Sequence, residues 1–377
     1  MAGANILVAA HRVRDCAGVF LNVKPIKLLL VSPCQGAYGG IEAFVLAVAA
    51  AVRKEPDFEV RICFKKTKNF ARQPSLKTML AGESAVEFCE RGSRDLASEI
   101  RWADLVHLQN ASPDVAFFAK LFRKRLVMTI HNYMPRDWSA HRFLWRWSAK
   151  LADARWYNSQ FVWETWEGDR KRRASRKVAT TSKLPEGWTP PAERTGFAFV
   201  GRWIANKGID TLLDAYAQAE IDRAKWPLVL MGDGPLRSLI EYAIERRGVS
   251  GIRVLGFVDE ETKAREMKNA RWVVVPPNTK EDFGLTAVEA RHLGVPCIIT
   301  RDGGLPEAGG PQALICEPGD PAALAKLLEQ ATRMSEPEYA ERARRTREEL
   351  ATELEPIEFY ARAYRQIFRG EPAESAV

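Results

Sequence analysis

The sequence is poor in the residues that build metal sites and disulfide frameworks. It has 5 histidines and 6 cysteines in 377 residues, with no Cys-x-x-Cys pair and no histidine cluster beside a cysteine. Zinc sites and disulfide-stapled domains place such residues at short, regular spacings. Neither kind of structure is therefore expected, and widely spaced reduced thiols fit a cytosolic compartment.

Long apolar runs are also missing. No stretch approaches the roughly 18 apolar residues that cross a bilayer, and the opening residues lack the pattern of a signal peptide. The apolar fraction of 46% and the charged fraction of 28% are ordinary for a folded protein. A chain of 377 residues exceeds what one core usually organises. We expect a soluble, cytoplasmic protein with two domains.

The net charge of +8 is unevenly distributed along the chain. Residues 1–190 hold 31 Lys and Arg against 18 Asp and Glu, which gives +13, whereas residues 191–377 hold 25 against 30, which gives −5. This asymmetry predicts different partners for the two halves, with the first half facing an anionic one. A plain difference between two solvated surfaces explains the charges equally well.

The first half alternates short apolar strands with helices. Its first predicted strand, over 27–32, is a buried run typical of parallel sheets, and a glycine-rich turn over 35–42 leads into a helix over 43–53. Further predicted elements are strands over 58–64, 105–108 and 126–130 and a helix over 116–123. Such alternation is typical of a parallel sheet covered on both faces.

The pattern restarts after a proline-rich stretch over 184–191, which we interpret as a linker between domains. The predicted elements are strands over 197–200, 228–231, 272–275 and 297–300, and helices over 210–220 and up to Arg247. The fold class is therefore α/β, with two Rossmann-like, doubly wound parallel-sheet domains. Such sheets bind ligands at the carboxyl ends of their strands, so we expect a site in the cleft between the domains.

Two cations follow the first strand of the second half. Arg202 and Lys207 lie in the loop before the next helix, whose N-terminus is also electropositive. This combination suits the binding of a diphosphate. Solvated surface residues are the alternative interpretation, because exposed Lys and Arg are common.

Two glutamates, Glu281 and Glu289, are separated by seven residues in Glu-Asp-Phe-Gly-Leu-Thr-Ala-Val-Glu. A helix that begins near Gly284 would let backbone N–H groups approach a phosphate closely. Glu289 would then lie on the first turns of this helix, within reach of ribose hydroxyls, and Glu281 near a sugar on the distal phosphate. An ordinary surface salt bridge is the alternative for Glu289.

Two histidines end predicted strands of the first half. His131 follows the strand over 126–130, where it would face the cleft from the first domain. His107 ends the strand over 105–108 and is a further candidate. A purely structural histidine is the alternative for both.

Taken in order along the chain, these segments resemble the retaining glycosyltransferases of family 4, which have the two-domain GT-B architecture. In the first half the resemblance rests on Gly39-Gly40-Ile41-Glu42, Thr129-Ile130-His131-Asn132 and Asn158-Ser159. In the second half it rests on Gly201-Arg202, Lys207-Gly208, Gly232 to Pro235, Gly256 to Val258, Glu281 to Glu289, Gly294 to Pro296 and Gly303 to Glu307. It runs from about Lys27 to the C-terminal helices and is densest after residue 197.

The resemblance implies four residues that act in the reaction. Arg202 and Lys207 would hold the donor's diphosphate and stabilise the leaving nucleotide as negative charge develops on it. Glu281 would contact hydroxyls of the donor sugar. His131 would contact the transferred sugar near the acceptor.

The resemblance also implies a set of donor-binding residues. Glu289 would bind the ribose, and backbone N–H groups at Phe283, Gly284 and Leu285 would meet the sugar and the distal phosphate. Gly40 would let the first domain approach the diphosphate. The residues that would border the nucleobase are Gly232, Phe257 and Val258.

The chemistry implied is retaining transfer of a sugar from a UDP- or GDP-sugar to a glycan or lipid-linked acceptor in the synthesis of cell-envelope polysaccharide, lipopolysaccharide or glycolipid. No Asp-x-Asp occurs in the sequence, so no divalent metal and no cofactor are expected. The Arg202 and Lys207 cations would supply the electrostatic stabilisation instead. Glu281 is not assigned as a nucleophile.

The domains implied are 27–188 for the acceptor side, joined by the C-terminal helix over 357–371, and 189–356 for the donor side. Residues 1–26 have no counterpart in the resemblance and are expected to form an extension, either a disordered arm or the product of an upstream start. Asp282 departs from the family, which often has a small residue or proline there. That departure leaves the donor unassigned.

A basic, tryptophan-rich segment over 136–177 contains 6 of the 11 tryptophans and 11 Lys and Arg against 5 Asp and Glu. Apolar and basic residues mix in this way in interfacial helices, which favours peripheral attachment to the anionic inner face of the cytoplasmic membrane. A core helix under the sheet is the alternative. Nucleic-acid binding is not expected, because no recognised RNA- or DNA-binding motif accompanies the segment.

Two other functions remain open at this stage. One is a sugar-nucleotide epimerase or a phosphorylase on a related two-domain fold. The other is a catalytically silent protein that binds nucleotide sugars. The presence of Arg202, Lys207, Glu281 and Glu289 together favours a working transferase over a silent protein.

Overall fold

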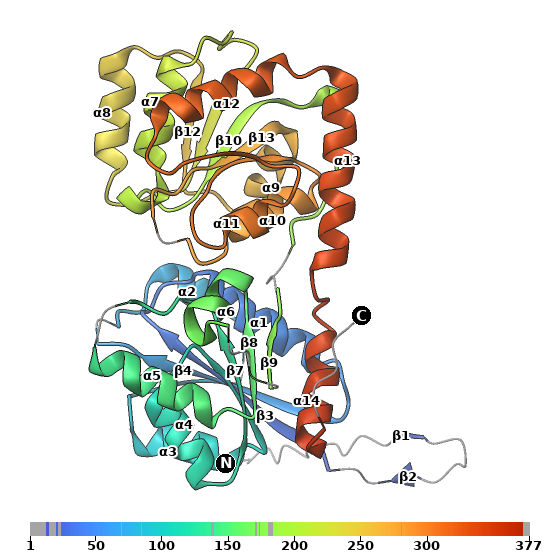
Figure 1. Cartoon of the computed structure of the whole chain (residues 1–377). Helices are drawn as coiled ribbons and strands as arrows, with labels where there is room; N and C mark the ends of the chain where they lie inside the picture. The colour runs from blue at the N-terminus through green and yellow to red at the C-terminus, as the bar shows by residue number, and fades with distance from the viewer. Residues whose placement is uncertain are drawn as a thin grey trace, which may run out of the picture.

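The computed structural model describes residues 13–14, 20–21 and 24–371 except 69, 84, 137–138, 170–171, 173, 180–183 and 280. Most of the predicted extension over 1–26, together with Trp138, therefore lies outside the described residues. Two α/β domains stand one above the other, with the N-terminal domain below in Figure 1. A short antiparallel pair, β1 (Val13–Arg14) and β2 (Phe20–Leu21), precedes them.

A parallel sheet of seven strands forms the centre of the N-terminal domain, in the order β5-β4-β3-β6-β7-β8-β9. The strands are β3 (Ile26–Cys34), β4 (Phe58–Lys66), β5 (Val86–Cys89), β6 (Leu105–Gln109), β7 (Arg125–Ile130), β8 (Ala154–Tyr157) and β9 (Ser175–Lys177). The central strands are apolar on both faces because helices cover both sides. The helices are α1 (Gly40–Val52), α2 (Pro74–Met79), α3 (Arg94–Trp102), α4 (Pro113–Leu121), α5 (Ala140–Leu151) and α6 (Gln160–Glu167).

The C-terminal domain repeats this plan with a parallel sheet of six strands in the order β12-β11-β10-β13-β14-β15. These are β10 (Thr195–Val200), β11 (Leu228–Met231), β12 (Ile252–Gly256), β13 (Ala270–Val275), β14 (Cys297–Thr300) and β15 (Leu314–Cys316). Its helices are η1 (Pro191–Glu193), η2 (Ala205–Lys207), α7 (Ile209–Gln218), α8 (Arg237–Arg247), α9 (Glu260–Asn269), α10 (Leu285–His292), α11 (Leu305–Gly309), α12 (Pro321–Arg333) and α13 (Glu336–Glu353). The prediction of two doubly wound parallel-sheet domains is confirmed.

The last helix, α14 (Phe359–Arg369), leaves the C-terminal domain and packs on the N-terminal one (Figure 1). The Tyr364 hydroxyl lies 2.6 Å from Nδ1 of the buried His107. Arg365 forms ion pairs with Glu55 and Asp57 in the turn before β4. The final turns of the chain thus complete the core and the surface of the first domain.

The tryptophan-rich segment over 136–177 is not one interfacial helix. It contains α5, β8, α6 and β9, and Trp156 is a fully buried residue of β8. Trp166 on α6 is also buried. The core interpretation therefore holds for these two residues, whereas α5 has a face that is exposed. Within the described residues, none of the helices is long and apolar enough to cross a bilayer.

Candidate active site between the two domains

A cavity of about 280 Å³ lies between the domains, where the carboxyl ends of both sheets face each other. One wall comes from α1 and the ends of β7 and β8, and the other from the ends of β10 and β13 and the start of α10. The predicted site residues in its wall are Gly40, His131, Lys207, Glu281, Phe283, Gly284 and Leu285. Those not among its lining residues are Arg202, Gly232, Phe257, Val258 and Glu289.

The N-terminus of α10 points its free N–H groups toward this cavity. Gly284 precedes the helix with φ of 103°, and a Cβ there would come within 2.5 Å of the Leu305 side chain. Glycine is therefore required by both conformation and space. The first N–H groups of a helix have no partner inside it, and the helix dipole adds positive potential. Gly284, Leu285 and Thr286 line the cavity, so this end of it suits an anion.

A lysine and a carboxylate meet at the cavity wall. Lys207 Nζ lies 2.5 Å from Glu281 Oε2, and both side chains are largely buried. The backbone of Glu281 is fixed by its own N–H, which donates to Asp302 Oδ2 at 2.6 Å, and by its carbonyl, which accepts from the Gly304 N–H at 3.0 Å. A diphosphate that enters the cavity would meet Lys207 already held in place by Glu281.

Arg202 lies in the same loop, after β10, but outside the cavity wall. Its side chain is exposed, and the structure gives it no hydrogen bond or ion pair to any described residue. Its charge therefore remains available to a ligand that extends beyond the cavity. The proximity of Arg202 and Lys207 in sequence places the two cations at the same end of the sheet.

Glu289 lies on α10 and faces α9 rather than the cavity. Lys263 Nζ lies 3.1 Å from Glu289 Oε1 and 2.7 Å from Glu260 Oε2. Burial raises the pKa of Glu289, and Lys263 only partly opposes it. Burial alone would lower the pKa of Lys263, but Glu289 and Glu260 outweigh it and the pKa is raised. Glu289 does form a salt bridge, as its alternative interpretation expected, although both side chains are mostly shielded from solvent. Binding of a ribose by Glu289 stays a prediction.

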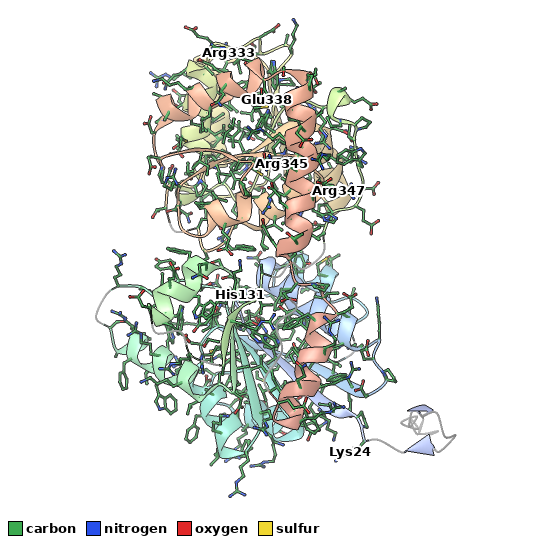
Figure 2. All side chains as sticks on the ribbon, turned by 45° about the vertical axis from the view of Figure 1, so that its right-hand side comes forward. Lys24, His131, Arg333, Glu338, Arg345 and Arg347 are labelled. Carbon is green, nitrogen blue, oxygen red and sulfur yellow. The ribbon has the colours of Figure 1, made fainter. Side chains whose placement is uncertain are left out.

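His131 lies in the cavity wall, at the end of the N-terminal domain that faces the C-terminal one, where Figure 2 labels it. Its Nε2 lies 2.9 Å from Gln109 Oε1, and its ring packs edge-on against the Phe44 ring, with 5.4 Å between the ring centroids. Burial lowers the pKa of His131 to about 4, so the ring is neutral near pH 7. With Nε2 donating to Gln109, Nδ1 is left as a hydrogen-bond acceptor.

An unpartnered amide oxygen lies beside this histidine. Asn158 is almost fully buried in the cavity wall, and its Nδ2 donates to the His131 carbonyl at 3.1 Å. Its Oδ1 is buried and has no hydrogen-bond partner among the described residues. A buried acceptor without a donor is costly, and a ligand hydroxyl in the cavity would satisfy it.

A carboxylate of the C-terminal domain bonds directly to the N-terminal domain. Asp282 Oδ1 accepts the Tyr133 N–H at 2.6 Å, and the Asp282 carbonyl accepts the Ser159 hydroxyl at 2.9 Å. Burial, and to a smaller extent the neighbouring Glu281 and Asp302 carboxylates, raise the pKa of Asp282 to about 6. A second contact, from the Gln160 N–H to Glu307 Oε2 at 2.7 Å, lies nearby.

The predicted glycines allow close approach of backbone segments. A Cβ at Gly40 would come within 3.1 Å of the Leu285 side chain, across the interface between the domains. Gly232 has φ of 127°, and a Cβ there would lie 1.8 Å from the Gly201 carbonyl oxygen. Beyond it, Phe257 is 77% exposed and Val258 packs partly into the core. Gly232 follows β11, and Phe257 and Val258 follow β12; none of the three is among the residues of the cavity wall.

His107 does not reach the cavity. It is fully buried, with Nε2 2.7 Å from the Thr129 hydroxyl and its ring against Tyr360 and Trp156. Burial lowers its pKa to about 3. Of the two interpretations of His107, the structural one is correct.

Three residues near the site were missed by the reasoning from sequence. Gln109 is the last residue of β6, the strand that also carries His107, but an uncharged amide gives no signal of its role. Lys263 meets Glu289 from a helix 26 residues earlier, and nothing in the local sequence links the two. Asp282 was noted only as a departure from the family, although it carries the bond between the domains.

Within the described part of the chain, no group of three or more His, Cys, Asp or Glu side chains is placed as a metal site would require. The charged groups at the cavity are instead Lys207, Glu281 and Asp282.

Comparison with known proteins identifies the fold. Residues 181–349 match the family described as "Glycosyl transferases group 1". The HepE protein of Anabaena, crystallised with UDP and glucose, superimposes with a TM-score of 0.70 at 17% identity over 88% of this chain and 97% of that one. At this identity the likeness concerns the fold, which is GT-B.

Curated relatives match the chain in part. An uncharacterized glycosyltransferase of Methanocaldococcus jannaschii is 35% identical over 134 residues, 35% of this chain and 36% of that protein. The O-antigen chain mannosyltransferase C of Escherichia coli is 28% identical over 183 residues, 47% of this chain and 48% of that protein. The matches thus span about a third and about half of the length of these relatives.

Proposed function

We propose that this chain is a retaining glycosyltransferase that moves a sugar from a UDP- or GDP-sugar to a glycan or lipid-linked acceptor in envelope polysaccharide, lipopolysaccharide or glycolipid synthesis, without a divalent metal. The observation that carries the proposal is the meeting of Lys207, Glu281 and the N-terminus of α10 in one cavity at the facing ends of two parallel sheets. The matches to group 1 glycosyltransferases and to an O-antigen mannosyltransferase support it. So does the UDP bound by HepE.

In the proposed reaction, the bond between the anomeric carbon and the distal phosphate oxygen breaks, and its electron pair stays on the diphosphate. The oxygen of an acceptor hydroxyl forms the new bond to the anomeric carbon on the same face, and its proton leaves with the nucleoside diphosphate. Charge therefore develops on the diphosphate, where Lys207, Arg202 and the α10 N–H groups would stabilise it. The attraction between a positioned cation and this developing charge is stronger in a cavity that excludes water, because the local dielectric constant is lower.

The remaining polar groups would orient the sugar. Glu281 is in position to accept hydrogen bonds from sugar hydroxyls, and so are the Asn158 Oδ1 and the neutral His131 ring. Glu289 lies one turn along α10 and pairs with Lys263 of α9, and a ribose attached to the diphosphate would reach this pair. Each group is held by a neighbour before the ligand arrives, which lowers the entropy cost of binding.

Attachment to an anionic membrane surface is a further part of the proposal. On α5, Phe143 is 73% exposed, and Leu144 and Trp147 are also exposed. Arg146 and Lys150 lie exposed along the same helix. Aromatic and aliphatic side chains flanked by cations are typical of helices that lie in a membrane interface. Such attachment would bring the acceptor side of the cavity near lipid-linked glycans.

Thermal unfolding and product assays test the proposed function. Full-length protein is heated with UDP-, GDP- and ADP-sugars, since a donor that binds the folded state raises the midpoint. The stabilising donor is then incubated with envelope glycolipid extract, and nucleoside diphosphate and the anomeric configuration of the product are followed by NMR. Lys207→Ala should reduce turnover at least 100-fold, and the exposed Lys225→Ala should leave it unchanged.

The same assays separate the alternatives. An epimerase would change the sugar nucleotide without releasing nucleoside diphosphate, and a phosphorylase would require inorganic phosphate. A silent binding protein would be stabilised by a donor and release nothing. Turnover within twofold of wild type for Lys207→Ala would contradict the proposed use of the cavity.

A further inference from the structure

A second cavity of about 250 Å³ adjoins the first on the side of the N-terminal domain. Asn132 and Asp282 line both cavities. The two spaces therefore meet at the pair of loops where the domains touch. A group bound in the second cavity would face the first one across these two residues.

Aromatic rings and uncharged amides make up most of the second cavity. Tyr133, Trp145 and Trp166 supply the rings, and Asn110 and Asn132 supply the amides. No lysine, arginine or histidine is among its lining residues, and Asp282 is the charged one. This composition disfavours a phosphate and suits a neutral ligand with apolar faces and polar edges.

We propose that this second cavity binds one neutral sugar ring of the acceptor, with the reacting hydroxyl directed past Asn132 and Asp282 into the first cavity. The ring's C–H faces would pack on the aromatic side chains, and its hydroxyls would bond to the amides and the carboxylate. The inference rests on the proposed function and assigns the class of its acceptor.

The walls of this cavity are held rigid by hydrogen bonds. The Trp166 Nε1–H donates to the Asn132 carbonyl at 2.8 Å, and the Met134 N–H donates to the Thr165 hydroxyl at 2.9 Å. Asn110 has φ of 58°, unusual for a residue other than glycine, and its Oδ1 accepts the His131 N–H at 2.8 Å. The loop that carries His131 and Tyr133 is thus fixed between β6 and α6. A preformed wall is what specific recognition of a small ring requires.

Asp282 gives the cavity a wall from the opposite domain. Its carboxylate is held by the Tyr133 N–H and its carbonyl by the Ser159 hydroxyl. The cavity is complete only while these contacts between the domains are made. Acceptor binding and donor binding would therefore both favour the same arrangement of the domains and strengthen each other.

Binding of methyl glycosides tests this site independently of catalysis. Saturation-transfer NMR on the full chain would use methyl glycosides of glucose, galactose, mannose and N-acetylglucosamine as probes, with and without UDP. We expect saturable binding of at least one, tightened by UDP. Trp145→Ala should weaken it at least tenfold, and Phe117→Ala, which removes an exposed ring on α4, should leave it unchanged.

A second variant covers the case in which Trp145→Ala fails to fold. Asp282→Asn keeps the shape and the acceptor for the Tyr133 N–H, so it should fold, keep donor-induced stabilisation and lose at least fivefold in glycoside affinity. The proposed site would be overturned if Asp282→Asn and folded Trp145→Ala both bound the glycosides as tightly as wild type does. It would also be overturned if wild type showed no saturable binding. If the protein binds glycosides but never releases nucleoside diphosphate, the result would contradict the proposed function and not the site.

Discussion

The Asp282 carboxylate of the C-terminal domain accepts a hydrogen bond from the backbone N–H of Tyr133 in the N-terminal domain, at 2.6 Å. The bond ties the loop that carries His131 to the loop that carries Glu281, so it connects the two walls of the cavity. Because burial raises the pKa of Asp282 to about 6, this contact is sensitive to pH.

The stability of the folded protein should fall as the pH rises through 6 on account of Asp282. Its pKa is higher in the folded protein than in the unfolded chain, so folding binds a proton between about pH 4 and 6. The stabilisation is complete below pH 4 and is lost above 6. Asp282→Asn, which mimics the protonated state, should be more stable than wild type by about 1 to 3 kcal/mol at pH 8.

Urea unfolding at pH 4.5 and pH 8 measures this difference. The gap between Asp282→Asn and wild type should shrink at pH 4.5 to about a third of its size at pH 8, because the stabilisation is complete only below pH 4. A gap of the same size at both values would show that Asp282 does not titrate in this range.

The pair formed by Lys263 and Glu289 should respond unequally to removal of either partner. Glu289→Gln leaves Lys263 with Glu260, so we expect a loss below about 1 kcal/mol in the free energy of unfolding. Lys263→Met leaves the buried Glu289 carboxylate without a cation and should lower the free energy of unfolding by about 2 to 4 kcal/mol at pH 8. The second loss should shrink as the pH falls, because burial raises the pKa of Glu289 and the carboxylate can then take up a proton.

A double-mutant cycle with Lys263→Met and Glu289→Gln checks the assignment, since neighbours in one ion pair do not behave additively. The double variant should recover most of the stability lost by Lys263→Met. Additive losses would mean that the two side chains act separately.

Burial should keep His131 neutral as long as the residue against its Nε2 carries no charge. Gln109→Glu places a carboxylate against Nε2 and should raise the pKa of His131 from about 4 toward neutrality. Gln109→Ala removes the bond without adding charge and should leave the ring neutral. Histidine C–H chemical shifts, followed between pH 3 and 8, report the titration of His131 directly.

The pH dependence of transfer activity in Gln109→Glu tests whether the neutral His131 ring takes part in the reaction. If the neutral ring accepts a sugar hydroxyl, the Gln109→Glu variant should lose activity as the pH falls below the new pKa and regain it above. A pH profile identical to that of wild type, with a shifted His131 titration, would exclude a role for the neutral ring.

The exposed face of α5 should carry the affinity for anionic membranes. Phe143→Ser with Trp147→Ser removes apolar area from this face and should reduce flotation with phosphatidylglycerol vesicles at least threefold. Leu239→Ser, an equally exposed change on α8, is the matched control. Binding should also fall as salt rises from 50 to 500 mM, because Arg146 and Lys150 act through a screened potential. Absence of wild-type flotation at 50 mM salt would contradict the proposal.

The sequence was sufficient for the fold because its central strands are continuous apolar runs. Residues 28–31 and 272–275 are buried on both faces of their sheets, and only a parallel sheet under two layers of helices buries a strand in this way. Shorter or more polar strands such as β9, whose residues Ser175–Lys177 include two cations, gave no such signal. Strand β8 was hidden in the tryptophan-rich segment for the same reason, since aromatic and basic residues suit a helix face as well.

The site was predictable only where local sequence determines local geometry. Gly284, the glycine before α10, indicates a helix N-terminus that a phosphate can approach closely. Lys207 and Glu281 each follow a strand, and the topology of the sheet brings the ends of these strands together. The order of residue types along the sequence did not indicate contacts between distant segments. The bond from Tyr133 to Asp282 joins residues 149 apart, and Lys263 reaches Glu289 from another helix.

The position of α14 has a consequence for the order in which the chain can fold. Tyr360 and Tyr364 lie in the core of the N-terminal domain, and the buried His107 depends on Tyr364 for one of its hydrogen bonds. During synthesis the N-terminal sheet leaves the ribosome first, yet the residues that close its core follow the whole C-terminal domain in the chain. The core of the first domain can therefore close only after the second domain has been translated.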